Sequence, residues 1–423
     1  MLNQAQKRKY KLDEQNQSCN RESLSPKKRK KSEIKERHTP NNYESKPANK
    51  QIQRPKIVMV MGQGDAGQLG LGPNVFEARK PRIVCGLPDS IVDIAAGGMH
   101  SLVLTSSGSV YSWGCNDEGA LGRSSDIDDD YSQPAQVQID ANIVQISAGD
   151  SHSAALCSDG NVFIWGVFRD KNGKIGLINS SIEMLPIQLQ TPVKIKCISS
   201  GSDHLLMLGC DKKVYAIGCS EQGQRGDVPR DKWLTVLPLF GKNKICVNIW
   251  TGYYASFVQV ESSHDIIAFG LNNYCQLGIN TKDTMVSNGK AIDRVIAGRI
   301  KCISCADHHT LSLTSSGFVY TAGRKEYGRL GTGDKSDNKQ FRIVRNGLQN
   351  RIICQISAGP SVSFAVSRRG LLYSWGMGDN LCTGRSEDVS KPERVVSVST
   401  DYHVEKVAAG GQHCILLLYL RKL

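Results

Sequence analysis

The chain has 423 residues, of which 39% are hydrophobic and 22% charged, and its formal net charge is +13. This length exceeds the roughly 100–200 residues of a typical domain, so the chain needs several cores or one large repetitive architecture. No stretch approaches the ~18 consecutive apolar residues of a membrane span, and the first residues lack the apolar core of a signal peptide. We therefore expect a soluble, intracellular protein without a membrane partner.

The first segment, residues 1–54, is strongly basic. It holds fifteen Lys and Arg against six acids, and so carries +9 of the net charge. Because it is poor in apolar residues and has no periodicity, it cannot offset the entropy cost of folding, and we expect a disordered tail. Its basic run is typical of a nuclear import signal, read by an import receptor, and also attracts nucleic-acid phosphates; the run consists of Lys27, Lys28, Arg29, Lys30 and Lys31. The alternative is a tail that only solubilises the protein.

From residue 55 onward one unit repeats. Strand-like segments end in glycine every 52 or 53 residues, at Gly62, Gly114, Gly166, Gly218, Gly270, Gly323 and Gly376. A second marker, small-Gly-x-x-His, ends at His100, His152, His204 and His413, with a degenerate copy at His309. Two units carry Ala255 and Val362 instead of the histidine. A period of about 50 residues in seven copies predicts a seven-bladed β-propeller of four-stranded blades.

The strands of one unit can be placed from its turns. In the second unit we expect strands at residues 81–84, 91–95, 101–105 and 109–113, with a tight turn at residues 106–108. No segment shows ten or more residues of helical periodicity, so the domain at 55–423 is predicted to be all-β. The first strand, residues 57–61, lacks the strands that precede it in other units, and we expect it to complete the last blade and close the ring. Antiparallel order places the His turns and the Trp-Gly loops on one face and the tail on the other.

Several apparent motifs are better explained as scaffold. Gly62-Gln-Gly64-Asp-Ala-Gly67 matches a dinucleotide fingerprint, but no helix follows it. Asp150, Ser151 and His152 are adjacent in the chain and cannot relay a proton among themselves. Cys302 and Cys305 lack a second ligand pair at zinc spacing, so we expect buried thiols and no metal. We expect no cofactor either, and we interpret the repeated histidines as turn residues that bond backbone groups of their own blade.

Residues that break the repeat are the better functional candidates. Before the repeat histidine, several units carry the titratable residues Asp150, Asp203, Asp307 and His308. Capping of backbone amides by the aspartates is the alternative interpretation. A second break inserts two residues after Trp165 on the same face. Because this insertion carries an aromatic and charged residues beside the acids, it indicates a protein-contact loop.

These motifs resemble the regulator of chromosome condensation family. The resemblance is carried by residues 64–72, Ala96-Gly-Gly-Met-His100, residues 114–123, 147–152 and 326–331, and by Phe168-Arg-Asp-x-Asn-Gly173, and it spans about residues 55–423. It implies a seven-bladed propeller that acts as a chromatin-bound guanine-nucleotide exchange factor for the small GTPase Ran. Such a protein accelerates nucleotide release without bond chemistry and is therefore not an enzyme in the usual sense.

The resemblance also implies roles for single residues. The exchange-critical acids fall on Asp150 and Asp203, the critical histidine on His308, and further partner contacts on Asp65 and His413. The insertion, residues 167–174, is similar to the family's β-wedge, which presses on the phosphate-binding region of the GTPase; its contact residues are Phe168, Arg169, Asp170, Lys171, Asn172 and Gly173.

The resemblance implies nuclear, chromatin-associated localisation, with DNA bound through the basic tail. A basic excursion that helps the family grip histones is reduced here to residues 224–232, with Asp227 in place of an expected arginine, so histone contact stays open. The alternative function is a chromatin or protein-interaction platform that has the same fold but no exchange activity.

Overall fold

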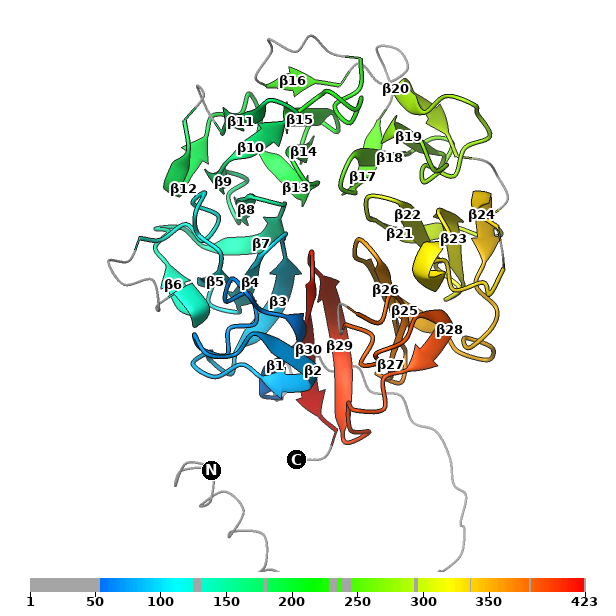
Figure 1. The fold of residues 1–423 in the computed structure, drawn as a ribbon. Coiled ribbons are helices and arrows are strands. Elements are labelled where there is room, and N and C mark those ends of the chain that lie inside the picture. Colours follow the sequence, from blue (N-terminus) through cyan, green and yellow to red (C-terminus); the bar gives the residue numbers. More distant parts are fainter. Residues whose placement is uncertain are drawn as a thin grey trace, which may run out of the picture. The chain divides into compact units, whose positions relative to one another are not determined.

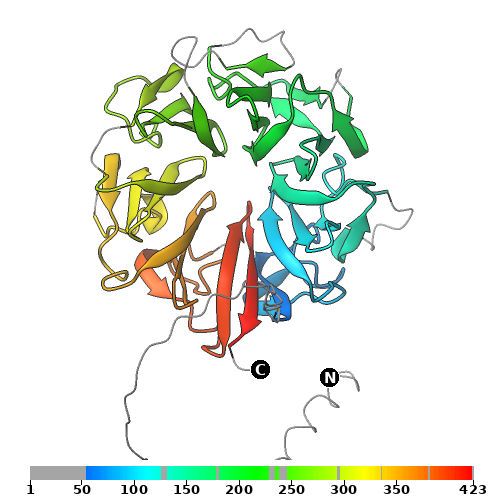
Figure 2. The ribbon, with the colours of Figure 1, turned by 180° about the vertical axis from the view of Figure 1, so that it is seen from behind.

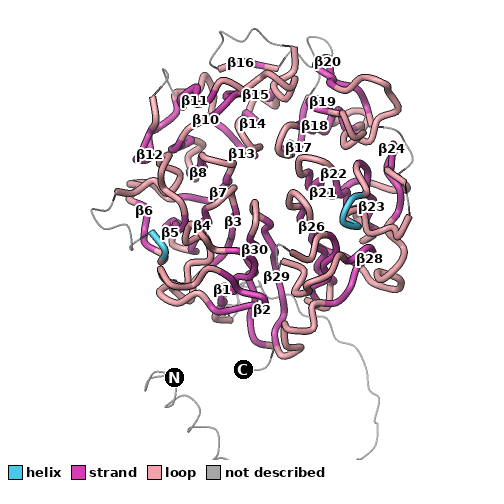
Figure 3. The backbone as a smooth tube through the Cα atoms, in the orientation of Figure 1, coloured by secondary structure: helices cyan, strands magenta, loops and turns pink. Residues whose placement is uncertain are grey.

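The computed structural model describes residues 54–124, 131–177, 181–227, 234–237, 245–292, 296–334, 336–379 and 382–421. In these ranges seven four-stranded antiparallel sheets form the blades of a ring (Figure 1), which confirms the predicted all-β propeller. Helix is limited to short 3-10 turns such as η2 (Glu326–Gly328), cyan in Figure 3. No helix of this part of the chain is long and apolar enough to cross a membrane. The predicted import signal, residues 27–31, lies outside the described residues.

In blades 1 to 6 the strands run from the hub of the ring to its rim in chain order, whereas in blade 7 the order from hub to rim is β29, β30, β1 and β2. Blade 1 consists of β3 (Ile91–Ala96), β4 (His100–Thr105), β5 (Val110–Gly114) and β6 (Ala135–Val137). Blade 2 consists of β7 (Ile143–Ala148), β8 (His152–Cys157), β9 (Val162–Gly166) and β12 (Glu183–Leu189). Blade 3 consists of β13 (Ile195–Ser200), β14 (His204–Gly209), β15 (Val214–Gly218) and β16 (Thr235–Val236). Blade 4 consists of β17 (Cys246–Thr251), β18 (Ala255–Val260), β19 (Ile266–Leu271) and β20 (Met285–Ala291). Blade 5 consists of β21 (Ile300–Cys305), β22 (His309–Thr314), β23 (Val319–Gly323) and β24 (Asn338–Ile343). Blade 6 consists of β25 (Ile353–Ala358), β26 (Val362–Ser367), β27 (Leu372–Gly376) and β28 (Val389–Arg394). Blade 7 consists of β29 (Tyr402–Ala409), β30 (His413–Leu420), β1 (Lys56–Gln63) and β2 (Glu77–Ile83), and an extra hairpin, β10 (Phe168–Asp170) with β11 (Gly173–Gly176), lies between β9 and β12.

The grouping of strands differs from the sequence-based expectation in one respect. Residues 81–84 were expected to begin the second unit, but β2 pairs with β1, Met59 opposite Ile83, and forms the outer strand of blade 7. The assignment was wrong because a repeat period fixes the spacing of strands but not which strand begins a blade. The N-terminal part of the domain therefore contributes two strands to the last blade instead of one.

Blade 7 closes the ring as predicted. Strand β1 lies between β2 and β30, with Lys56 opposite Tyr419 and Gly62 opposite His413, and the two views show these blue and red strands side by side (Figures 1 and 2). Lys56 thus lies at the end of the blade away from the turn that contains residues 410–412. We call the face with residues 97–99, 149–151, 201–203 and the equivalent turns the histidine-turn face, and the opposite one the tail face.

The core lies between the blades. Every residue of β4 and of β8 is buried, because a middle strand has strands beside it and a neighbouring blade on each face. Between blades 1 and 2, the indole of Trp165 donates to the carbonyl of Ala120 at 2.8 Å. Gly122 follows in the same loop at φ +67°, and a Cβ there would lie 2.7 Å from the Trp165 ring nitrogen. The Trp-Gly and Leu-Gly markers of the repeat are therefore two halves of one contact between blades.

Four of the five repeated histidines also join blades, so the expectation that they bond their own blade was wrong for these four. Nε2 of His100 lies 2.9 Å from Ser153 Oγ in the next blade, and equivalent pairs follow His204, His309 and His413. The glycine of the marker makes room for the ring: a Cβ on Gly149 would lie 2.0 Å from His152 Cε1. Burial lowers the pKa of His100 to about 3, so the ring is neutral and serves as scaffold.

Candidate functional site

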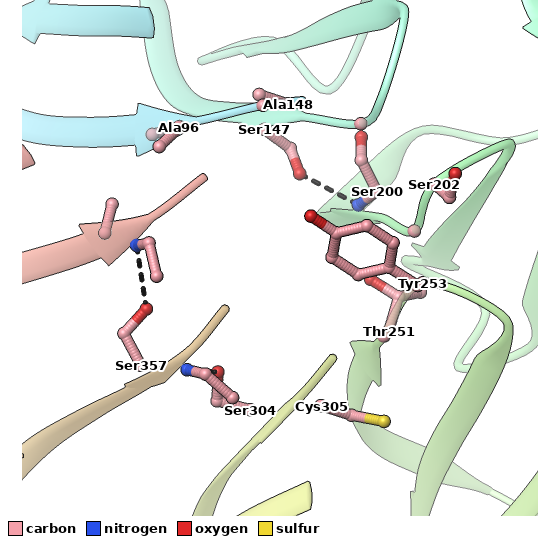
Figure 4. A pocket seen from close by; sticks show the side chains of 18 of the residues that line it. Ala96, Ser147, Ala148, Ser200, Ser202, Thr251, Tyr253, Ser304, Cys305 and Ser357 are labelled. Carbon is pink, nitrogen blue, oxygen red and sulfur yellow. Dashed lines mark hydrogen bonds between the residues drawn. The ribbon is translucent and has the colours of Figure 1, made fainter. Parts of the chain in front are cut away.

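The hub of the ring is a narrow cavity of about 270 Å³ lined mostly by small side chains (Figure 4). Hydroxyl groups link its inner strands, because the N–H of Ser200 donates to Ser147 Oγ at 2.8 Å and that of Ala409 to Ser357 Oγ at 3.0 Å. The ring of Tyr253 projects into this space (Figure 4), and burial raises the pKa of its phenol well above the usual range. The hub is therefore scaffold, with one aromatic ring at its edge.

A second cavity, of about 360 Å³, lies next to the hub and shares Tyr253 with it. Its walls come from the turns of three blades, which contribute Asp150, Asp203 and Tyr254, and from residues 169–171 of the inserted hairpin. The structure thus brings the two predicted acids and the predicted loop to one place on the histidine-turn face. Tyr253 and Tyr254 were not predicted as site residues, although the absence of a repeat histidine at Ala255 marked their turn as unusual.

Asp203 holds the base of the hairpin. Its Oδ1 accepts a hydrogen bond from the backbone N–H of Arg169 at 2.8 Å, and its Oδ2 accepts one from the Ser202 hydroxyl at 2.7 Å. Only 8% of the residue is exposed. Burial raises the pKa of this carboxyl to about 6, although the bonds from Ser202 and Arg169 act in the opposite direction. Both oxygens are therefore engaged within the protein.

Asp150 differs from Asp203 in having an open carboxylate. The residue is half-buried, and none of the described side chains donates a hydrogen bond to it. Burial raises its pKa, and the Arg169 charge partly offsets that rise. The neighbouring blade leaves room for it, since a Cβ on Gly98 would lie 2.3 Å from Asp150 Oδ1. The Asp150 carboxylate therefore keeps its oxygens available as hydrogen-bond acceptors.

The hairpin is clasped by Glu118, which belongs to the loop after β5 in blade 1. The Arg169 guanidinium donates to both oxygens of Glu118, with Nε at 2.8 Å from Oε2, and Lys174 Nζ lies 3.1 Å from Oε1. Burial opposes ionisation of Glu118, but the bonds from Arg169 and Lys174 outweigh it and lower the pKa. Charge-assisted bonds of this kind are stronger than neutral ones, so Glu118 fixes the direction of the hairpin.

Two further contacts hold the other side of the hairpin. Glu221, in the loop after β15 in blade 3, accepts from the Lys171 N–H at 2.9 Å, and its Oε1 lies 3.7 Å from Lys171 Nζ. Phe168 is fully buried, with its ring centroid 4.5 Å from that of His152. Phe168 is thus an anchor beneath the hairpin, whereas Lys171, Asn172 and Gly173 are exposed at its tip.

Glu118 and Glu221 were not predicted as site residues. Each belongs to a glycine-rich loop that recurs in the repeat and was therefore interpreted as scaffold. Each also lies about 50 residues from the hairpin in the chain. Their charge next to a cationic insertion in the neighbouring blade was the one signal that could have indicated them.

His308 lies in the equivalent turn of blade 5. Its Nδ1 is 2.7 Å from Asp307 Oδ2, and its ring centroid is 5.0 Å from that of Tyr274. The Arg324 guanidinium covers the Tyr274 ring at 4.5 Å. Burial raises the pKa of Asp307, although the His308 charge acts to lower it. His308 does not line the cavity that contains Asp150, so the predicted site extends along the face as two separate groups of residues.

Asp65 and His413, the remaining predicted contacts, differ in accessibility. Asp65 is exposed in the loop after β1. His413 is buried, with Nε2 at 2.9 Å from Ser101 Oγ, and so joins blades 7 and 1 in this conformation. Cys305 is also buried, and burial raises the pKa of its thiol to about 12. Within the described ranges, no three His, Cys, Asp or Glu residues are grouped so that they could hold a metal ion.

Comparisons with known proteins show which family this chain belongs to. The model of the RCC1-like domain matches residues 57–416. The human regulator of chromosome condensation is 39% identical over 386 residues, covering 86% of this chain and 91% of its own length. The guanine nucleotide exchange factor SRM1 of Saccharomyces cerevisiae is 28% identical, covering 86% of this chain and 87% of its own.

Solved structures of yeast proteins match the fold of this chain. Prp20p of Saccharomyces cerevisiae, solved in a study of its binding to Gsp1p and histones, matches with a TM-score of 0.79 and 27% identity over 87% of this chain and 92% of that one. Yeast RCC1 (Prp20) bound to Kap60 matches with a TM-score of 0.80 and 27% identity over 87% and 90% of the two chains. The family model covers most of this chain, and the human relative is 39% identical over most of both chains; the chain therefore belongs to the RCC1-like domain family.

Proposed function

We propose that this protein is a guanine-nucleotide exchange factor for the small GTPase Ran and that it accelerates GDP release from the histidine-turn face. The observation that carries the proposal is the open carboxylate of Asp150 beside a hairpin clasped by Glu118 and Glu221. The exchange-factor name of the yeast relative supports it. No group on this face has to make or break a covalent bond.

The physical requirement is a coupling between two binding equilibria. Small GTPases hold nucleotide at nanomolar to picomolar affinity, or about 12–16 kcal/mol. A protein that binds the empty GTPase more tightly than the loaded one weakens nucleotide binding by the same factor. A fixed hairpin serves this purpose, because a flexible one would lose part of its binding free energy on being ordered.

The residues divide into two roles. Asp150 accepts a lysine of the partner, which draws that cation from the nucleotide phosphates, and the exposed Asp65 and the His308 turn add contacts. Asp203 acts through the backbone of Arg169 and positions the hairpin. The tip at Lys171, with Asn172 and Gly173, contacts the phosphate-binding region of the GTPase.

We further propose that the protein is nuclear and associated with chromatin. The basic segment at residues 1–54 supplies an import signal at residues 27–31 and contacts to DNA phosphates. The yeast relatives bound to Kap60 and studied with histones support an import receptor and chromatin as partners. Direct histone contact is not part of this proposal, because the loop at residues 224–232 is short.

The test is release of fluorescent GDP from purified Ran. We expect the full chain to accelerate release, and Asp150→Asn to slow it about thirtyfold or more, since losing one partner of a desolvated charge pair costs roughly 2 kcal/mol or more. Asp159→Asn, in a turn of the tail face, is the matched control and should leave release unchanged. Binding of Ran without any acceleration would mean an interaction platform and would refute the exchange function.

A further inference from the structure

The seams of the ring, meaning the contacts between neighbouring blades, are not all bonded alike. At the other seams from blade 1 to blade 7, the first N–H of an inner strand donates to a turn of the preceding blade on the tail face. Ile195 donates to the Gly160 carbonyl at 2.9 Å, and Ile353 donates to the Gly317 carbonyl at 3.1 Å. The equivalent N–H of blade 5, that of Ile300, makes no bond to blade 4 within the described residues. The seam between blades 4 and 5 therefore lacks this bond.

At the hub, the same seam lacks the hydroxyl bonds that its neighbours have. Ser199 Oγ lies 2.7 Å from Thr251 Oγ1 across blades 3 and 4. Across blades 5 and 6, Ser304 Oγ accepts from the Ala358 N–H at 2.9 Å. Blade 4 carries Trp250 at the position of these serines, and an indole ring offers no hydroxyl to blade 5.

The next polar side chain of the inner strand turns away from the seam. In blade 2, Gln145 Nε2 donates to the Ile198 carbonyl of blade 3 at 2.8 Å. Asn248 has the equivalent place in blade 4, but it donates to Gln259 Oε1 of its own blade at 2.6 Å. In the part of the chain that the structure describes, Asn248 therefore makes no hydrogen bond to blade 5.

A thiol of blade 5 fills the place of the missing histidine. Ala255 stands in blade 4 where other blades carry the repeat histidine. In blade 2, a Cβ on Gly149 would meet the ring of His152, whereas in blade 4 a Cβ on Gly252 would lie 2.4 Å from Cys305 Sγ. The polar contact of the histidine with a neighbouring hydroxyl is thus replaced here by close packing of Cys305.

Apolar packing and two bonds at one end hold this seam. Phe257 of blade 4 and Ile303 of blade 5 belong to one buried cluster. On the histidine-turn face, Gln276 Nε2 donates to the Asp307 carbonyl at 3.1 Å, and the Thr310 hydroxyl donates to the Gln276 carbonyl at 2.6 Å. Apolar contact is non-directional, so the two blades can separate at the hub and tail face while these two bonds act as a hinge.

We infer that the propeller opens reversibly at the seam between blades 4 and 5. Local opening takes place where few interactions have to break. The seam separates the turns of Asp150 and Asp203, in blades 2 and 3, from the turn of His308 in blade 5, so its opening changes the spacing of the two groups. A GTPase bound to both groups therefore holds the seam closed; this part rests on the proposed function, whereas the opening itself does not.

The test is the rate at which native thiols react with N-ethylmaleimide in the full chain, measured site by site by peptide mass spectrometry. Cys305 is the probe of this seam and is 6% exposed. The matched controls are Cys246, between blades 3 and 4, and Cys414, between blades 6 and 7, which are 4% and 0% exposed. Because a buried thiol reacts only when the structure opens, we expect Cys305 to react about tenfold faster than either control. The exposed Cys85 and Cys210 should react at once.

Equal rates for Cys305 and the two controls would overturn the inference, since all three thiols would then report unfolding of the whole domain. Ran at about ten times its Kd should slow the reaction of Cys305 about tenfold, because binding stabilises the closed form. Ran that binds without changing this rate would overturn the link between seam and site. Failure of Ran to bind would refute the proposed function instead, and the rates measured without Ran would still decide whether the seam opens.

Discussion

The carboxyl of Asp203 should destabilise the folded protein at neutral pH. Its pKa is raised from 3.8 to about 6 by burial, so the group favours the folded state only while it is protonated. The favourable contribution of the protonated Asp203 carboxyl to the free energy of unfolding is complete below about pH 4 and is lost as the pH rises through about 6. A shift of about two pKa units corresponds to about 3 kcal/mol. Asp203→Asn removes this cost and keeps an oxygen to accept from the Arg169 N–H.

Thermal unfolding at two pH values measures the effect. For a domain of this size, 3 kcal/mol corresponds to a rise in Tm of roughly 3–6 °C, which we expect for Asp203→Asn at pH 7.5. The gain should fall to about half at pH 5, because the wild-type carboxyl is then mostly protonated in the folded state. Asp65→Asn, at an exposed position of the same face, should stay within about 0.5 kcal/mol of the wild type. A variant no more stable than the wild type at pH 7.5 refutes the reasoning.

Two further changes test the hairpin and the turn of Asp150. Glu118→Gln removes the charge that holds Arg169, whose guanidinium can then pair with Asp150; GDP release from Ran should fall about tenfold, equivalent to about 1.4 kcal/mol. The same change in an Arg169→Ala background should have little additional effect, and an equal drop in both backgrounds would contradict this coupling. Gly98→Ala places a methyl group 2.3 Å from Asp150 Oδ1 and should slow GDP release. Gly86→Ala, where nothing lies within 4 Å of the added Cβ but φ is +84°, should lower Tm and spare release, and equal release rates for the two glycine variants would argue against a role for the Asp150 position.

The repeat period was sufficient to predict the propeller, because the spacing of the Gly and His markers reflects contacts that recur once per blade. The phase of the repeat was not predictable in the same way. Strand β2 has the same local pattern whether it begins one blade or ends another, and only its pairing with β1 decides between them. A cyclic repeat has no unique starting point, so sequence periodicity carries no information on this choice.

The candidate site was predicted where single residues break the repeat and missed where contacts cross between blades. Asp150, Asp203 and the hairpin stood out as departures from the pattern. Glu118 and Glu221 did not, since their partners lie about 50 residues away in the chain. For the same reason the histidines were assigned to the wrong partners: the Ser153 hydroxyl that meets His100 belongs to the next unit.

The construction of blade 7 has a consequence for how the protein is made. A ribosome releases β1 early, but β30, its partner on one side, is synthesised more than 350 residues later. Until then β1 has an unpaired edge, and contacts of such long sequence separation form slowly. Blades 1 to 6 can assemble during translation, whereas the last blade must wait until β29 and β30 have been synthesised. The newborn protein therefore passes through a long-lived open ring, the stage at which an exposed strand edge is most prone to aggregation.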